Sequence, residues 1–209
     1  MALAGRRIAV EGGEGAGKST QAGLLARALG AECSREPGGT KLGERIRALL
    51  LDPGAGEVSA RAELLLVLAA RSQHLEERIE PALAAGRHVV VDRFSGSTVA
   101  YQGYGRGLAL GEVLEACSLA SRGRSPDLNV LLDVPVELGA SRAGSSPDRI
   151  EASSRAFHER VRAGFAAQAA ADPERWCVVD GSGPPAEVAA AVLDAVRTRL
   201  GLEPAPVSP

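Results

Sequence analysis

Eight consecutive residues near the start of the chain have the composition and spacing of a phosphate-binding loop. Residues 12–19 read G-G-E-G-A-G-K-S, which fits the pattern G-x-x-x-x-G-K-[ST]. Small residues let successive backbone N–H groups converge on phosphate oxygens, and the helix that follows directs its positive end at the same anion. Lys18 can reach the β- and γ-phosphates, and the Ser19 hydroxyl can hold Mg²⁺. The predicted ATP contacts are Gly12, Gly13, Glu14, Gly15, Ala16, Gly17, Lys18, Ser19 and Thr20.

The alternative for this stretch is a glycine-rich turn that happens to contain a lysine and a serine. The chain has only two lysines, Lys18 and Lys41, and its other 22 basic residues are arginines, so a lysine in this slot is not a consequence of composition. The planar fork of an arginine also suits the loop less well than a compact ammonium group. A strand over 7–11 and a helix over 20–29 flank the motif, which is the context that it requires. We therefore predict nucleotide binding.

Asp92 and Arg93 form a second candidate, directly after the apolar run V-V-V at 89–91. A carboxylate at the end of a strand beside a phosphate loop is well placed to organise Mg²⁺, directly or through water. Its alternative role is to cap the next helix. Arg93 can clamp a phosphate through two parallel hydrogen bonds, and its alternative is a solvated surface arginine.

Apolar strands alternate with helical stretches along the whole chain. Strands are predicted at 7–11, 31–34, 87–92, 128–134 and 176–180. Helices are predicted at 20–29, 42–51, 60–85 (broken or kinked at Pro81), 97–102, 111–120, 151–171 and 186–200. Continuous apolar strands with intervening helices predict a five-stranded parallel sheet covered on both faces, the three-layer α/β fold of P-loop NTPases. The carboxyl ends of the strands then carry the site.

Composition narrows the class of protein. The 209 residues are enough for one domain, predicted over 1–202, with a loose proline-rich tail at 203–209. A net charge of −2 and only 3% aromatic residues argue against nucleic acid as a partner. Cys33, Cys117 and Cys177 are far apart and odd in number, which favours reduced thiols. With no membrane span or signal peptide in the sequence, the predicted location is the cytoplasm.

Five motifs in order make the chain resemble the thymidylate kinase family. Besides the phosphate loop they are R-E-P-G-G-T at 35–40, D-R-F at 92–94 with S-T-V-A-Y-Q-G at 97–103, P-D-L through L-D-V at 126–134, and D-R-I-E at 148–151. The resemblance covers residues 8 to about 180. It implies transfer of the γ-phosphoryl group of ATP to thymidine monophosphate with Mg²⁺, in a homodimer.

The resemblance also implies an acceptor site. Arg93 would hold the monophosphate, Glu14 would accept a hydrogen bond from the sugar 3′-OH, and Tyr101 would lie under the sugar. Arg71 and Gln102 would bind the base. The full predicted substrate set is Glu14, Glu36, Pro37, Arg47, Val67, Arg71, Arg93, Ser97, Thr98, Tyr101 and Gln102. Simpler alternatives are a loop filler for Glu14, a solvated helix face for Arg71 and a core aromatic for Tyr101.

Residues 141–147 are small and polar, which predicts a flexible lid. With the residues that follow, the lid is predicted to cover about 141–150. A closing loop that bears arginine can neutralise the charge that develops on the transferring oxygens. The phosphate loop has Ala16 and no arginine, and the resemblance implies that the lid then supplies arginines, as in many bacterial members of the family; Arg142 and Arg149 are the candidates. The predicted catalytic set is Lys18, Asp92, Arg93, Arg142 and Arg149, with Ser19 and Asp92 for the metal. Asp148 and Glu151 can equally form a helix capping box.

One position departs from the family pattern. The family usually has a Phe four residues before the base-reading arginine, and here that position is Val67. Stacking of a base on an aromatic ring is worth about 1–3 kcal/mol, so Val67 predicts weaker or less selective base binding. Slow turnover is a further expectation, because this lid has fewer arginines than those of many bacterial relatives. Two alternative functions stay open: a nucleoside monophosphate kinase with altered base preference, and a non-catalytic nucleotide-binding regulator.

Overall fold

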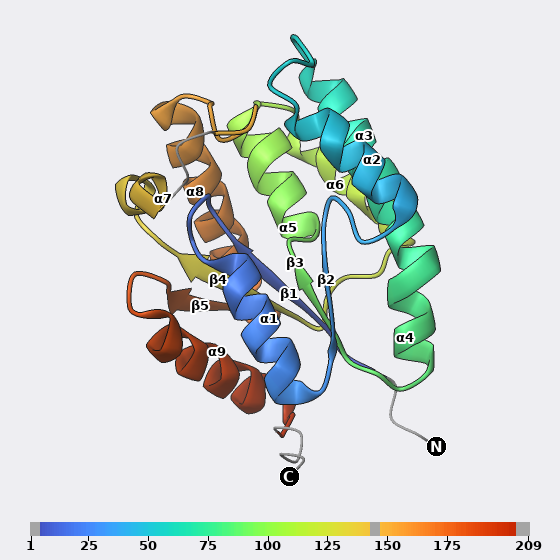
Figure 1. Cartoon of the computed structure of the whole chain (residues 1–209), viewed down its shortest axis with the longest axis vertical. Helices are drawn as coiled ribbons and strands as arrows, with labels where there is room; N and C mark the ends of the chain where they lie inside the picture. Colours follow the sequence, from blue (N-terminus) through green and yellow to red (C-terminus); the bar gives the residue numbers. More distant parts are fainter. Residues whose placement is uncertain (1–4, 143–146, 204–209) are drawn as a thin grey trace.

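A five-stranded parallel sheet forms the centre of the molecule (Figure 1). The computed structural model describes residues 5–142 and 147–203. The strands are β1 (Arg7–Gly12), β2 (Glu32–Arg35), β3 (Val89–Asp92), β4 (Leu128–Asp133) and β5 (Trp176–Asp180). Their order across the sheet is β2-β3-β1-β4-β5, and Ile8 at the centre pairs with Val90 on one side and Leu128 on the other. The predicted fold class and all five strands are confirmed, with bounds that differ by no more than two residues.

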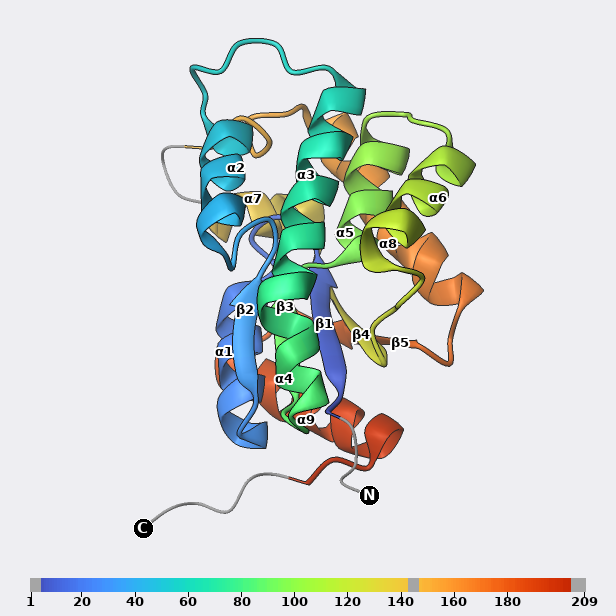
Figure 2. The ribbon, with the colours of Figure 1, turned by 90° about the vertical axis from the view of Figure 1, so that its right-hand side faces the viewer.

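Helices cover both faces of the sheet. They are α1 (Lys18–Leu29), α2 (Lys41–Leu51), α3 (Ala60–His74), α4 (Glu80–Ala84), α5 (Ser95–Thr98), α6 (Leu110–Ser121), α7 (Val136–Arg142), α8 (Arg155–Ala171) and α9 (Pro185–Leu200). Helices α1 and α9 pack on one face, and α4, α5 and α8 lie on the other. Helices α2 and α6 and most of α3 extend beyond the carboxyl edge of the strands (Figure 2). This arrangement leaves the site between the edge of the sheet and these outer helices.

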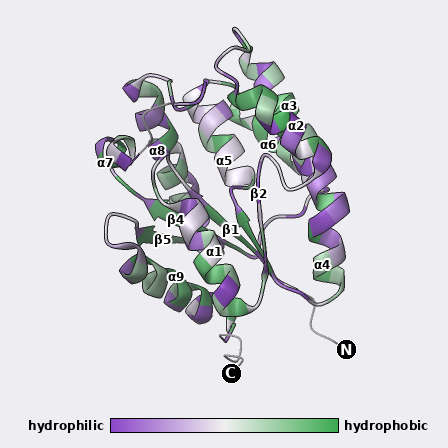
Figure 3. Ribbon diagram, in the orientation of Figure 1, coloured by the Kyte–Doolittle hydropathy of each residue, from purple (hydrophilic) through white to green (hydrophobic). Residues whose placement is uncertain are grey.

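The core is divided by the sheet into layers, as the alternation of side chains along a strand requires. Ile8 and Val10 of β1 belong to the cluster under α1 and α9, whereas Ala9 between them packs on the opposite face. Hydrophobic residues accordingly gather where helices meet strands, and hydrophilic residues lie on the outer helix surfaces (Figure 3). In the described part of the chain no helix is both long enough and apolar enough to cross a membrane.

Two helical stretches contain π-helical turns that the sequence analysis did not predict. The helical path from Ala60 continues to Ala84, and a π-helical segment at Leu75–Ile79 comes just before Pro81. This wider turn accommodates the missing N–H and the bulk of the proline ring. Of the predicted break or kink at Pro81, the break is wrong, because the helical path continues through the proline. The second π-helical segment, Val99–Gly105, extends the short helix α5 and carries two predicted site residues, Tyr101 and Gln102.

The region around the predicted lid differs most from expectation. The helix expected from 151 begins at Arg155, because Ser154 caps it by accepting a hydrogen bond from the Phe157 N–H. Asp148 and Glu151 do exchange the bonds of a capping box, but they close a separate turn before the helix. The first part of the expected run, Ser141 and Arg142, is the end of α7, which was not predicted. Residues 143–146 of the expected lid, and 204–209 of the expected tail, lie outside the described residues.

Candidate active site

The phosphate loop joins β1 to α1 in the conformation that its glycines allow. Gly15 and Gly17 have φ angles of 65° and 84°, in the left-handed region that favours glycine. At Gly15 a Cβ atom would lie 2.0 Å from the carbonyl oxygen of Gly139, so the loop also packs closely against α7. The small residues of the motif therefore serve both the turn and this contact. Helix α1 begins at Lys18, directly behind the loop.

Lys18 is buried inside the loop, where its Nζ donates to the carbonyl oxygen of Gly13 at 2.5 Å. Burial and the neighbouring charge of Arg93 lower its pKa from 10.5 to about 8, and Glu14 and Asp92 only partly offset them. The positive charge of the Lys18 ammonium is therefore only partly compensated by the carboxylates around it. The phosphates of a nucleoside triphosphate supply the missing negative charge, so the geometry suits Lys18 for an anionic ligand.

Asp92 ends β3 beside Val10 of β1, and this register brings it to the phosphate loop. The Ser19 hydroxyl donates to Asp92 Oδ2. Asp92 Oδ1 is buried and has no hydrogen-bond partner among the described residues. A hydroxyl and an unpaired carboxylate oxygen side by side are the hard oxygen donors that Mg²⁺ prefers. The residues present therefore fit the metal that accompanies ATP, and a capping role for Asp92 is not needed to explain its position.

Arg93 follows in a left-handed backbone conformation, with φ at 69°, which is uncommon outside glycine. Its guanidinium donates to Gly12 O at 3.0 Å and to Glu14 Oε1 at 2.8 Å, and it lies 4.9 Å from the centre of the Tyr101 ring. The side chain is thus turned toward the phosphate loop and away from the surface. This excludes the alternative of a solvated surface arginine.

Glu14 is the acceptor at the centre of this group. Its Oε1 receives the Arg93 guanidinium and the Tyr101 hydroxyl, the latter at 2.7 Å. Burial raises the pKa of Glu14, but the charges of Arg93 and Lys18 and the Tyr101 hydrogen bond outweigh it and lower the pKa to about 2. Glu14 is therefore an ionised carboxylate held among cations. A mere loop filler would make none of these contacts.

A second polar group lies at the other end of the cavity. Arg71 is almost completely buried and donates to Glu36 Oε2 at 2.7 Å and to Thr98 Oγ1 at 2.8 Å. Its guanidinium lies 4.8 Å from the centre of the Phe94 ring. Glu36 also pairs with His74 Nδ1 at 3.0 Å. The side chains of Glu36, Thr98 and Phe94 thus fix Arg71, and the solvated helix face considered from the sequence is wrong for it.

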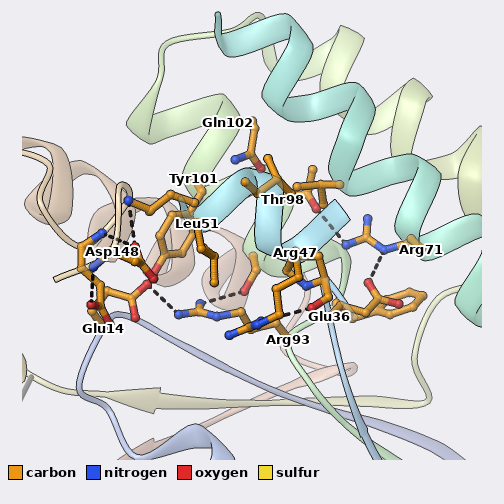
Figure 4. A pocket seen from close by; sticks show the side chains of 17 residues that line it. Glu14, Glu36, Arg47, Leu51, Arg71, Arg93, Thr98, Tyr101, Gln102 and Asp148 are labelled. Atoms are coloured by element: carbon orange, nitrogen blue, oxygen red, sulfur yellow. Dashed lines mark hydrogen bonds and ion pairs between the residues drawn. The ribbon is translucent and has the colours of Figure 1, made fainter. Parts of the chain in front are cut away.

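These two groups are the ends of one cavity, drawn in Figure 4. Glu14 and Asp148 lie at one end, Glu36 and Arg71 at the other, and Thr98 and Gln102 stand between them above Arg93. All residues predicted for the acceptor line it: Glu14, Glu36, Pro37, Arg47, Val67, Arg71, Arg93, Ser97, Thr98, Tyr101 and Gln102. The sequence analysis missed the remaining lining residues, which are Leu50, Leu51, Phe94, Asp148, Ile150 and Glu151.

The two predicted lid arginines lie apart. Arg142, at the end of α7, donates to the carbonyl oxygens of Gly181 and Ser182 at 2.8 and 2.7 Å. It lines a groove with phosphate-loop residues on the α9 side of the loop. Arg149 donates to Leu50 O at 2.9 Å and to Glu63 Oε2 at 2.7 Å, and its chain neighbours Asp148 and Ile150 line the cavity. The two guanidiniums do not meet at a common point in this structure.

Glu63 is a buried carboxylate near the cavity that the sequence analysis overlooked. Its side chain is about 1% exposed and receives hydrogen bonds from Gln102, Arg106 and Arg149. A signal for it existed, because Glu63 precedes Val67 and Arg71 by one and two helical turns and so shares their face of α3. Its partners Arg106 and Arg149 are distant in sequence, so the sequence alone did not indicate that these three side chains lie together.

A phosphate loop at the carboxyl ends of a parallel sheet, beside a cavity with Arg93 next to the loop and Arg71 at its far end, is typical of P-loop nucleoside monophosphate kinases. The profile of the family described as thymidylate kinase matches residues 10–192. A thymidylate kinase of Synechococcus sp. is 50% identical over 93% of this chain and 96% of its own length. One from Alcanivorax borkumensis is 50% identical, covering 87% of this chain and 91% of its own. The crystal structure of thymidylate kinase from Ehrlichia chaffeensis superposes with a TM-score of 0.77 at 30% identity, over 92% of this chain and 99% of that one. The chain belongs to the thymidylate kinase family.

Proposed function

We propose that this chain transfers the γ-phosphoryl group of ATP to thymidine monophosphate, which gives thymidine diphosphate and ADP. The observation that carries the proposal is the acceptor cavity, which adjoins the phosphate loop at Glu14 and Arg93 and ends in the buried Arg71. A nucleoside monophosphate has an anion at one end and a hydrogen-bonding base at the other. The cavity offers a cation for the first and fixed polar groups for the second. Family membership names the base as thymine.

Each end of the cavity has a role in this proposal. Arg93 holds the acceptor phosphate, and its contacts with Gly12 O and Glu14 fix that arginine beside the loop. Glu14 accepts from the sugar 3′-OH, and Tyr101 lies under the sugar, where its ring crowds a 2′-OH. Arg71 and Gln102 face the base, with Glu36 and Arg47 beside them. The protein then accelerates transfer by positioning and by stabilising charge, without a covalent intermediate.

For the metal, Ser19 and Asp92 would hold Mg²⁺ next to the phosphates. Bound there, the ion would neutralise charge on the β- and γ-phosphate oxygens. Asp92 Oδ1 supports this role because the described residues leave it without a partner. Lys18 supplies the remaining fixed positive charge in the loop. Arg142 and Arg149 stay our candidates for the lid, over about 141–150.

The wider properties of the protein are also proposals. We propose one kinase domain over 1–202, with a loose tail at 203–209. A cytoplasmic location is supported by Cys33, Cys117 and Cys177, which are all free thiols. A homodimer is supported by exposed leucines on α3 and α6, namely Leu65, Leu110 and Leu114. Light scattering on the purified chain tests the dimer.

The test of the activity is a coupled assay of ADP release with ATP, Mg²⁺ and each nucleoside monophosphate in turn, in deoxy and ribo forms. Turnover with thymidine monophosphate far above all others supports the proposal. Turnover with several deoxynucleotides would keep the kinase and make Val67 the cause of a broader preference. No turnover with any acceptor would favour the regulatory alternative. Our proposal predicts that Lys18→Ala abolishes turnover. The matched control is Lys41→Ala, at the exposed start of α2, which should keep wild-type turnover.

A further inference from the structure

The amide of Gln102 is held in one orientation by a carboxylate outside the acceptor cavity. Its Nε2 donates to Glu63 Oε1 at 2.9 Å. We propose that Glu63, through this bond, makes the cavity selective for bases that present an N–H at ring position 3, thymine and uracil, over cytosine. The inference rests on the proposed function and adds a positioning residue to it.

The first step is the charge state of Glu63. It is completely buried, and it accepts from Arg106 Nε at 3.1 Å, from Arg106 Nη2 at 3.2 Å and from Arg149 Nη2 at 2.7 Å, besides Gln102. Burial raises the pKa of Glu63, but the hydrogen bonds from these three side chains outweigh it and hold the pKa below its ordinary value. An ionised carboxylate has no proton to donate. Only the NH₂ side of the Gln102 amide can therefore face it.

The second step is what this leaves in the cavity. Gln102 lines the cavity, and among the described residues no donor reaches its Oε1. With Nε2 turned to Glu63, the oxygen Oε1 is the Gln102 atom left to face the base, and it is an acceptor. Arg71, whose guanidinium has five N–H groups and donates to Glu36, Thr98 and Cys117, presents donors to the same cavity.

The third step is the match with the base. Thymine and uracil present a carbonyl at position 4 beside an N–H at position 3, which complement a donor and an acceptor. Cytosine presents an amino group and an unprotonated nitrogen, the reverse pattern. It would need the Gln102 amide turned over, which would place its oxygen against the Glu63 carboxylate. A site built to hydrogen-bond one pattern rejects its analogue because its buried polar groups are left unpaired. Val67 cannot stack on a base, so selectivity rests more heavily on these polar groups.

Glu63→Gln tests the inference directly. Oε2 accepts two arginine bonds, from Arg106 Nη2 and Arg149 Nη2, whereas Oε1 accepts one, from Arg106 Nε, besides that from Gln102. The introduced amide therefore keeps more bonds with its oxygen at the Oε2 position, which turns its NH₂ group toward Gln102. The Gln102 amide then turns over. We expect kcat/KM for deoxycytidine monophosphate to rise about tenfold or more and kcat/KM for thymidine monophosphate to fall by a similar factor. A rise in one activity is not produced by damage to the fold. Glu112→Gln, an exposed residue of α6 that pairs with Arg61, is the control and keeps the wild-type ratio.

Equal losses with both substrates in a folded Glu63→Gln variant would overturn the inference. If that variant does not fold, Gln102→Met is measured instead, because it leaves Glu63 paired with both arginines. It should lower kcat/KM for thymidine monophosphate about tenfold without lowering that for deoxycytidine monophosphate, because methionine removes the acceptor that cytosine cannot pair with. Equal effects on the two substrates would again refute the role of Gln102. Failure of the proposed function is separate, since it appears as absent thymidine monophosphate turnover in the wild-type protein.

Discussion

Glu14→Gln removes the negative charge at the junction between the phosphate loop and the acceptor cavity. Glu14 Oε1 accepts from Arg93 at 2.8 Å and from the Tyr101 hydroxyl at 2.7 Å. A pKa lowered from 4.5 to about 2 corresponds to about 3.4 kcal/mol, at 1.36 kcal/mol for each pH unit. The side chain is 22% exposed, and the introduced amide still accepts one hydrogen bond. We therefore expect the free energy of unfolding at pH 7 to fall by about 2–3 kcal/mol.

The pH dependence gives the sharper test. Because the folded-state pKa is below the unfolded-state value, the stabilisation is fully present above about pH 4.5 and is lost as the pH falls toward 2. The difference between wild type and Glu14→Gln should therefore be constant from pH 7 to about pH 5. At pH 3 it should be less than half as large.

Urea unfolding of both proteins without nucleotides, followed by circular dichroism from pH 7 to pH 3, measures this difference. Glu137→Gln is the control, because that carboxylate is 56% exposed and pairs with Arg155 at the surface, where such pairs contribute at most about 1 kcal/mol. A Glu14→Gln effect below 1 kcal/mol at pH 7, or one that does not change with pH, would refute the reasoning that Glu14 is a stabilised anion.

Three more predictions concern the same site. Val67→Phe should tighten thymidine monophosphate binding by about 1–3 kcal/mol through stacking, measured by calorimetry, and an unchanged affinity would show that Val67 does not face the base. Glu36→Ala should lower the free energy of unfolding by about 3–5 kcal/mol in urea, because it leaves Arg71 buried without its carboxylate; a loss under 1 kcal/mol would contradict the buried pair. ATP affinity should fall as the pH rises through about 8, because the Lys18 pKa is about 8 in the free protein and the neutral amine no longer attracts phosphate; calorimetry showing equal affinity at pH 7 and 9 would contradict it.

Much of the site was predictable because its residues sit in motifs that are local in sequence. The phosphate loop needs only small residues, a lysine and a serine in fixed order, and its strand and helix follow from apolar periodicity. Asp92 and Arg93 were predictable for the same reason, since parallel strands end at a common edge of the sheet. The resemblance to thymidylate kinases then supplied Arg71, Tyr101 and Gln102, which no local pattern separates from ordinary helix residues.

Other features depended on contacts between distant segments. Glu63 meets Arg106 and Arg149 across 43 and 86 positions of sequence, so neither pair has a local signature. The π-helical segment at Val99–Gly105 is another example, because helical periodicity predicts a stretch of helix without revealing a wider turn in it. The start of α8 was misplaced because Asp148 and Glu151 have the spacing of a cap, although they close a separate turn.

The sequence by itself determined the fold class, the phosphate loop and the identity of most residues around the acceptor cavity. It determined the fold class and the loop because strand periodicity, glycine conformation and motif spacing are properties of neighbouring residues, and the cavity residues because the ordered motifs resemble those of a known family. Only the tertiary structure decided the charge states and orientations of those residues. The Glu14 carboxylate is stabilised by Arg93, the Arg71 guanidinium is fixed by Glu36 and Thr98, and the Gln102 amide is oriented by Glu63. The physical reason is that burial and hydrogen bonding set a side chain's chemistry, and both come from packing between distant parts of the chain.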